Sequence, residues 1–254
     1  ALSRTLAQLE RDVSVRLVDR STHHVELTDA GRKFEQLAFD AVRAFEGALI
    51  GVDGRGTPLR LGHNWSAGTF LSGIVREWNR CERSCPLLVV RGEDRSAGLT
   101  SGKADIALTR GPVDPARFRT EVIAEEARVA VLPAGHPLAR KRRLALDDLA
   151  ELTLIGSTMG TTTPALWPDG RRPVLGAEVN TMDDWLVAIA TGAGFSVTVA
   201  STAVLHPHPD VRYVPLADAP PVPLMLAWPR RNPHPAVKEL LQVEREAATP
   251  SRGT

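Results

Sequence analysis

The chain has 254 residues, with 31 Lys and Arg against 30 Asp and Glu and a formal net charge of +1. This length is too great for one ordinary compact core and suits a small module joined to a larger α/β domain. The 43% hydrophobic and 24% charged content excludes wholesale disorder. Bulk charge favours no polyanionic partner, so any contact with DNA must come from local placement of basic residues.

The two cysteines, Cys81 and Cys85, are too few for a disulfide-stapled secreted fold. Four residues apart on a helix they would form a strained bridge, and two thiols fall short of a zinc site. We therefore expect no metal and no cofactor. No stretch approaches the roughly 18 apolar residues of a membrane span, and no secretory signal opens the chain. The expectation is a cytoplasmic protein without a membrane partner.

The first residues predict a helix with one apolar face, because Leu2, Leu6, Leu9 and Val13 are spaced by four, three and four. The opposite face carries Arg4, Gln8 and Arg11, with Ser3 at its shoulder. Arg and Gln can each read a base edge with two hydrogen bonds, and Ser can reach a base or a phosphate. Taken alone, the spacing fits an ordinary amphipathic surface helix better.

Two β-prone runs follow, at 15–20 and 25–28, around a polar break at 21–24. This pattern predicts a hairpin. Thr28 followed by Asp29 predicts a helix N-terminus, because a hydroxyl caps the first amides and an acid suits the first turn.

The next helix has a heptad seam, formed by Phe34, Ala38, Ala41, Phe45, Ala48 and Val52. The small N-terminal module offers no partner for it, so we expect pairing with a second copy of the chain. Gly51, Gly54 and Gly56 then indicate a short hinge before Pro58.

From Leu59 onward strand-like and helix-like segments alternate, which predicts parallel sheets with crossover helices in two α/β lobes. The predicted strands are 59–62, 87–91, 105–109, 128–132, 153–155, 174–179, 194–199 and 224–228. The predicted helices are 67–80, 96–101, 146–152, 183–191 and 235–246. Ligands of such sheets bind at the carboxyl ends of the strands.

Three strings then resemble the LysR-type transcription regulators. The first runs from Ala1-Leu2-Ser3-Arg4 through Val15–Arg20 to Glu26-Leu27-Thr28-Asp29-Ala30-Gly31; the others are 102–108 (GKADIAL) and 131–139 (VLPAGHPLA). The resemblance implies an α/β chain with a partial winged helix-turn-helix at 1–27 and a linker helix with hinge at 28–57. A two-lobed, periplasmic-binding-protein-like (type 2) effector domain follows at 58–254, with lobe I at about 58–126 and 226–250 and lobe II at about 127–225.

In this family a winged helix-turn-helix binds DNA, and we expect the chain to begin at its recognition helix, without the two preceding helices. Residues 1–57 hold eight basic and nine acidic side chains, so little phosphate attraction is expected from this portion. Ser3 and Arg4 match family positions that contact DNA, and Gln8 and Arg11 join them by their helix face. Arg20 and His23 would act from the wing and Thr28 from the linker-helix start.

The resemblance also implies an effector clamped between the lobes. The candidate residues follow predicted strands or precede helices: Asn64, Trp65, Ser66, Glu93, Thr109, Ser157, Thr158, Thr181 and Met182. Ser66 at a helix N-terminus suits an anion, whereas Glu93 disfavours an acidic effector and favours an amine or a hydroxyl. Helix capping is an equally good role for each hydroxyl.

We conclude that the sequence predicts a DNA-binding transcription regulator that is no enzyme, binds a small-molecule effector and forms a homodimer or homotetramer. One alternative is the solute-binding protein of a transporter, which shares the two-lobed fold. The other is a truncated regulator that oligomerises and senses but does not bind DNA.

Overall fold

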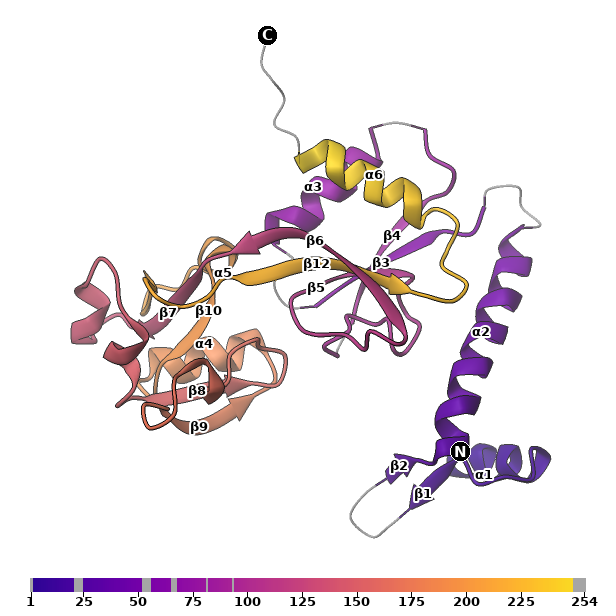
Figure 1. The fold of residues 1–254 in the computed structure, drawn as a ribbon, viewed down its shortest axis with the longest axis horizontal. Coiled ribbons are helices and arrows are strands. Elements are labelled where there is room, and N and C mark those ends of the chain that lie inside the picture. Colours follow the sequence, from indigo (N-terminus) through magenta and orange to yellow (C-terminus); the bar gives the residue numbers. More distant parts are fainter. Residues whose placement is uncertain are drawn as a thin grey trace. The chain divides into compact units, whose positions relative to one another are not determined.

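A computed structural model describes residues 2–20, 25–51, 56–64, 68–80, 82–92 and 94–248. The chain divides into two compact units, Ala1–Thr57 and Pro58–Thr254, each described by itself below (Figure 1). No helix in these described ranges combines the length and the apolar character that a membrane crossing requires.

The N-terminal unit consists of a helix, a two-stranded wing and a long second helix. Helix α1 spans Leu2–Asp12, strands β1 (Val18–Arg20) and β2 (Val25–Leu27) pair antiparallel, and α2 spans Asp29–Gly51. The predicted helix, hairpin and second helix are therefore confirmed, although the first strand begins at Val18 rather than at Val15. Residues 21–24, including the wing histidines His23 and His24, lie outside the described ranges.

Thr28 joins the wing to α2. Its hydroxyl donates to the carbonyl of Arg16 at 2.7 Å and accepts from the amide of Gly31 at 2.9 Å. The amide of Thr28 also donates to the carbonyl of Leu17 at 3.0 Å. The predicted capping role of Thr28 is confirmed, and the same side chain fixes the angle at which α2 leaves the wing.

Part of the predicted heptad seam of α2 is exposed. The side chain of Phe45 is 64% exposed, and neighbouring Leu37 and Val42 are also exposed. Val52 lies outside the described residues. Pairing of α2 with a second copy stays a prediction.

Lobe I of the C-terminal unit is built on one five-stranded sheet. Its strand order is β4 (Leu87–Arg91), β3 (Leu59–His63), β5 (Ile106–Thr109), β12 (Val222–Pro229) and β6 (Phe118–Glu126). Strand β3 is parallel to β4 and β5, whereas β12 is antiparallel to β5 and β6. Helices α3 (Gly68–Trp78) and α6 (Val237–Ala248) lie side by side over this sheet (Figure 1). The core between them contains Leu59, Leu61, Ile74, Trp78, Ile106 and Leu240.

Lobe II contains a three-stranded antiparallel sheet and a separate parallel pair. The sheet has the order β10 (Ser196–Val199), β7 (Arg128–Pro133), β11 (Val211–Pro215), and the pair is β8 (Thr153–Ser157) with β9 (Val174–Val179). Its helices are α4 (Met182–Ala190), α5 (Ala200–Leu205) and three short 3-10 turns, at Pro137–Arg140, Leu146–Leu149 and Pro164–Leu166. In the core the Trp167 indole meets the Phe195 ring edge-on, with centroids 5.9 Å apart.

Several predicted elements were wrong. Residues 96–101 form turns instead of a helix, because Ala97 and Gly98 have φ of 53° and 88°, which no α-helix accepts. The predicted helix at 146–152 is the short 3-10 turn Leu146–Leu149. The expectation of parallel sheets fails for β7, β10, β11 and β12. Strands β6 and β11 and helix α5 were not predicted; β6 is an edge strand with exposed Arg119 and Thr120, so its pattern is weakly apolar.

Two stretches of chain connect the lobes, and we call them the crossover segments. Residues 126–128 carry β6 of lobe I into β7 of lobe II, and residues 216–221 carry β11 back into β12 (Figure 1). Any change in the angle between the lobes must occur within these two segments.

Gly31 and Gly73 offer a matched test of this packing. A Cβ on Gly31 would lie 1.9 Å from the carbonyl oxygen of Leu17, whereas one on Gly73 meets nothing within 4 Å. We expect Gly31→Ala to destabilise the N-terminal unit by about 1–3 kcal/mol through overpacking. Gly73→Ala should stabilise the C-terminal unit by about 0.5–1 kcal/mol, because alanine favours a helix. Urea unfolding followed by circular dichroism measures both free energies of unfolding. Equal changes in the two variants would contradict the close packing of Gly31 against the Leu17 carbonyl.

Candidate functional site

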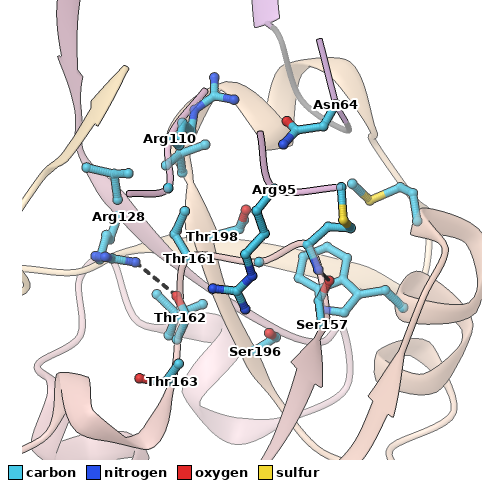
Figure 2. A pocket seen from close by; sticks show the side chains of 18 of the residues that line it. Asn64, Arg95, Arg110, Arg128, Ser157, Thr161, Thr162, Thr163, Ser196 and Thr198 are labelled. Atoms are coloured by element: carbon cyan, nitrogen blue, oxygen red, sulfur yellow. Dashed lines mark hydrogen bonds between the residues drawn. The ribbon is translucent and has the colours of Figure 1, made fainter. Parts of the chain in front are cut away.

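A cavity of about 210 Å³ lies between the two lobes. Among the described residues, lobe I contributes Asn64, Arg95, Arg110, Gly111 and Pro112. The crossover segments and the strand that follows them contribute Arg128, Val222 and Pro223. Lobe II contributes Ile155, Ser157, Met159, Gly160, Thr161, Thr162, Thr163, Met182, Trp185, Ser196, Val197, Thr198 and Val199 (Figure 2). A molecule in this cavity contacts both lobes at once.

The lobe II wall of the cavity has an apolar part and a hydroxyl-rich part. Trp185 and Ile155 are buried and, with Met159 and Met182, offer apolar surface. Hydroxyl groups come from the run Thr161–Thr163, from Ser157 and from β10. Apolar walls with a few placed polar groups are typical of small-molecule sites.

Three arginines line the cavity. The Nε of Arg110 donates to Oε2 of Glu126 at 2.5 Å, and both side chains are less than a tenth exposed. Arg128 is 9% exposed; its Nε donates to the carbonyl of Pro220 at 3.0 Å and its Nη1 to Oγ1 of Thr162 at 2.9 Å (Figure 2). Burial lowers the pKa of the Arg128 guanidinium. This arginine therefore ties both crossover segments to the hydroxyl-rich part of lobe II.

Arg95 makes a direct hydrogen bond between the lobes. It lies in the turns that follow β4, and its Nε donates to the carbonyl of Thr158 in lobe II at 3.0 Å. The hydroxyl of Thr109 donates to the carbonyl of Arg95 at 3.1 Å, so it holds the backbone that carries this arginine. Arg95, which lines the cavity, therefore joins lobe I to lobe II.

Three predicted effector residues, Asn64, Ser157 and Met182, line the cavity. Thr109, Thr158 and Thr181 are not among its described lining. The hydroxyl of Thr109 bonds to backbone as described above, that of Thr158 donates to Oδ1 of Asn180 at 3.0 Å, and that of Thr181 accepts from the Asp184 amide and caps α4. Trp65, Ser66 and Glu93 lie outside the described residues.

Sequence reasoning missed the arginines and the threonine run. Arg110 directly follows the predicted strand 105–109, so the strand-end rule could have found it. The three consecutive threonines 161–163 were a visible signal as well. Arg128 had no local signal, because its partners Thr162 and Pro220 lie 34 and 92 residues away.

On α1 the candidate DNA-contacting side chains Arg4, Gln8 and Arg11 are exposed. The Nε2 of Gln8 donates to Oδ1 of Asp12 at 2.8 Å, and its Oε1 accepts from Nη2 of Arg11 at 2.5 Å. Arg4 makes no hydrogen bond or ion pair with another described residue. Ser3 lies in α1 and Arg20 in β1. Arg4 can therefore contact a ligand without first breaking a bond to a described residue. Arg11, in contrast, is bonded to Gln8.

A helix and wing followed by two α/β lobes with a cavity between them define a ligand-sensing transcription regulator. Residues 1–32 match the family described as bacterial regulatory helix-turn-helix protein, lysR family, and residues 53–249 match the LysR substrate binding domain. The chain belongs to the LysR family of transcription regulators, whose members are not enzymes.

Similar proteins agree with this assignment. The chain is 31% identical over 238 residues to the HTH-type transcriptional regulator ShiR of Corynebacterium glutamicum, an alignment that covers 85% of this chain and 78% of ShiR. It is 32% identical over 168 residues to a probable hydrogen peroxide-inducible genes activator of Mycobacterium leprae, covering 61% of this chain and 52% of that protein. These relatives are regulators, which removes the solute-binding alternative.

Solved structures show the same fold. Full-length OxyR from Pseudomonas aeruginosa matches with a TM-score of 0.59 and 20% identity, covering 97% of this chain and 89% of OxyR. Full-length CbnR in complex with its target DNA matches with a TM-score of 0.57 and 22% identity, covering 97% of this chain and 88% of CbnR.

Replacing Arg95 tests the contact between the lobes. We expect Arg95→Ala to lower the hydrogen-exchange protection of segment 157–163 about two- to tenfold, because one exposed hydrogen bond contributes roughly 0.5–1.5 kcal/mol. Arg91→Ala, an exposed arginine at the end of β4, is the matched control. Equal exchange in the two variants would show that the Arg95–Thr158 bond does not hold the lobes.

Proposed function

We propose that this LysR regulator binds its effector in the cavity between the lobes and reads DNA with α1, as a homodimer or homotetramer working in the cytoplasm. The observation that supports the effector site is that the cavity is lined by both lobes and by a crossover segment. An effector there changes its contacts whenever the angle between the lobes changes. Ser157 and Met182 line the lobe II side and Asn64 the lobe I side.

Signal transmission follows from linkage between binding and lobe geometry. A ligand that binds one arrangement of the lobes better than another shifts the population toward it by its difference in affinity. The arrangement in turn biases how the subunits of the oligomer present their paired recognition helices to DNA. DNA then affects effector affinity by the same factor, because coupling is reciprocal.

For DNA reading we propose Arg4 as the base-reading side chain, with Ser3, Gln8 and Arg11 beside it and Arg20 and His23 on the wing. The amide-rich N-terminus of α2 supports a phosphate contact near Thr28. The Thr28 hydroxyl already donates to the Arg16 carbonyl, so the phosphate contact falls to backbone amides.

Arg4→Ala tests the DNA reader. We expect about a 10- to 100-fold loss of affinity for duplex DNA from upstream of the protein's own gene, because one base-reading arginine contributes roughly 1–3 kcal/mol. Fluorescence anisotropy of labelled DNA measures this loss. Arg76→Ala, which removes an exposed charge from α3, should leave the affinity unchanged.

Equal affinities of these two variants would show that α1 does not read DNA in the proposed way. A wild-type chain that binds effector and oligomerises but retains no affinity for this DNA would favour the other alternative, a regulator that senses without binding DNA.

Filling the cavity tests the effector site. Thr161 lines the cavity (Figure 2), and Thr161→Trp places an indole in the space that the effector needs. In a thermal-shift screen of small acids, amines and aromatics, a hit at about 100 times its Kd stabilises the wild type by roughly 2.7 kcal/mol. We expect the control Thr120→Trp, on the exposed edge of β6, to keep this shift and Thr161→Trp to lose it. A shift that survives in Thr161→Trp places the effector elsewhere.

A further inference from the structure

The charged side chains in the described lining of the cavity are all positive. Among the described residues the lining contains Arg95, Arg110 and Arg128 and no Asp or Glu. Glu126 lies directly beside the cavity but forms an ion pair with Arg110. The partners of Arg128 are a backbone carbonyl and a hydroxyl, both neutral, and no described carboxylate lies within ion-pair distance of it. One buried positive charge is therefore left without a counterion among the described residues.

A buried charge without a counterion is unfavourable, because protein groups replace its hydration only in part. The lowered pKa of the Arg128 guanidinium reports this cost. A ligand that brings a negative charge next to Arg128 removes much of this free-energy cost. An amine adds a like charge and increases the cost. A neutral ligand expels water from the guanidinium and offers no charge in return.

The hydroxyls around Arg128 suit an anion. Oγ1 of Thr162 accepts from Arg128, so its own proton is available to a ligand oxygen. Oγ of Ser157 accepts from the amide of Met159 at 3.2 Å and likewise keeps its proton. The hydroxyl of Ser196 is committed elsewhere, because it donates to the carbonyl of Ile155 at 2.9 Å. Charged hydrogen bonds from arginine and hydroxyl donors are the strong kind.

We propose that the effector is a small organic acid whose anionic group binds Arg128 and the Thr162 hydroxyl and whose apolar body packs against Trp185 and Ile155. The proposal rests on the proposed function and adds the chemistry of the ligand. The cavity of about 210 Å³ is smaller than the roughly 300–1,000 Å³ of typical ligand pockets, which favours a compact acid with one short chain or one ring.

This assignment replaces the expectation that Glu93 would favour an amine. Glu93 lies outside the described residues, and the described lining carries only cations. The site also senses lobe geometry directly, because Arg128 lies on one crossover segment and donates to Pro220 on the other. In this proposal Arg128 binds the effector, and its position depends on the two crossover segments.

The test compares small acids with their neutral and basic counterparts. The probes are benzoate, benzamide and benzylamine, and succinate with succinamide, measured by thermal shift and by calorimetry on the full chain. We expect at least one acid to bind, and each acid that binds to do so more tightly than its amide or amine. If no acid stabilises the wild type more than its amide does, the proposal is wrong.

Variants of the site make the test specific. Arg128→Gln should weaken the acid about thirtyfold or more, since truncating one partner of a buried charge pair has large effects. Arg128→Lys should retain part of the affinity, and Arg142→Gln, an exposed arginine of lobe II, should retain all of it. If Arg128→Gln does not fold, Thr162→Val, which keeps the shape, should weaken the acid about tenfold or more.

The two proposals fail differently. A neutral or basic probe that binds more tightly than the corresponding acid, and is blocked by Thr161→Trp, overturns the organic-acid proposal and leaves the cavity as the effector site. An acid whose affinity is the same in wild type, Arg128→Gln and Thr162→Val also overturns it. An acid that binds equally well to Thr161→Trp places the effector outside the cavity and overturns both.

Discussion

The hydrogen bond from Arg128 to the carbonyl of Pro220 joins the two crossover segments, and the effector domain is organised around it. The described lobes are connected through residues 126–128 and 216–221. The spacing of these two crossover segments therefore sets where the lobes meet and how wide the cavity between the lobes is. A second hydrogen bond, from the same guanidinium to the Thr162 hydroxyl, connects both segments with the cavity wall in lobe II. One buried cation thus connects both crossover segments with the cavity wall.

A comparison with Arg60 shows why Arg128 is unusual. In lobe I the Nε and Nη2 of Arg60 each lie 3.1 Å from a carboxylate oxygen of Asp105, a side chain that is 1% exposed. That two-pronged pair satisfies both charges and serves the fold. The charge of Arg110 is also balanced by a carboxylate, that of Glu126, through its Nε. Arg128 is more buried than Arg60, and its partners among the described residues are neutral. A charge left uncompensated at a cavity is typical of a functional site.

Features set by neighbouring residues could be predicted from the sequence, and those set by distant contacts could not. The Thr28 cap, the wing and α2 follow from residues within a few positions of one another. The failed helix at 96–101 depends on two positive φ angles that the tertiary structure imposes on Ala97 and Gly98. Strand β12 was expected, but its antiparallel place between β5 and β6 depends on partners over 90 residues away. For the same reason reasoning from strand ends found Ser157 and missed Arg128.

The N-terminal unit is built so that α1 moves with α2. Oε1 of Glu10 accepts from the amides of Leu17 and Val18 at 2.7 and 3.0 Å and fixes α1 to the wing. Thr28 and the tight approach of Gly31 to the Leu17 carbonyl fix the wing to α2. These bonds leave little freedom for α1 to move relative to α2. A change in how two α2 helices pair would therefore shift the exposed side chain of Arg4 as part of a rigid piece, without a rearrangement inside the N-terminal unit.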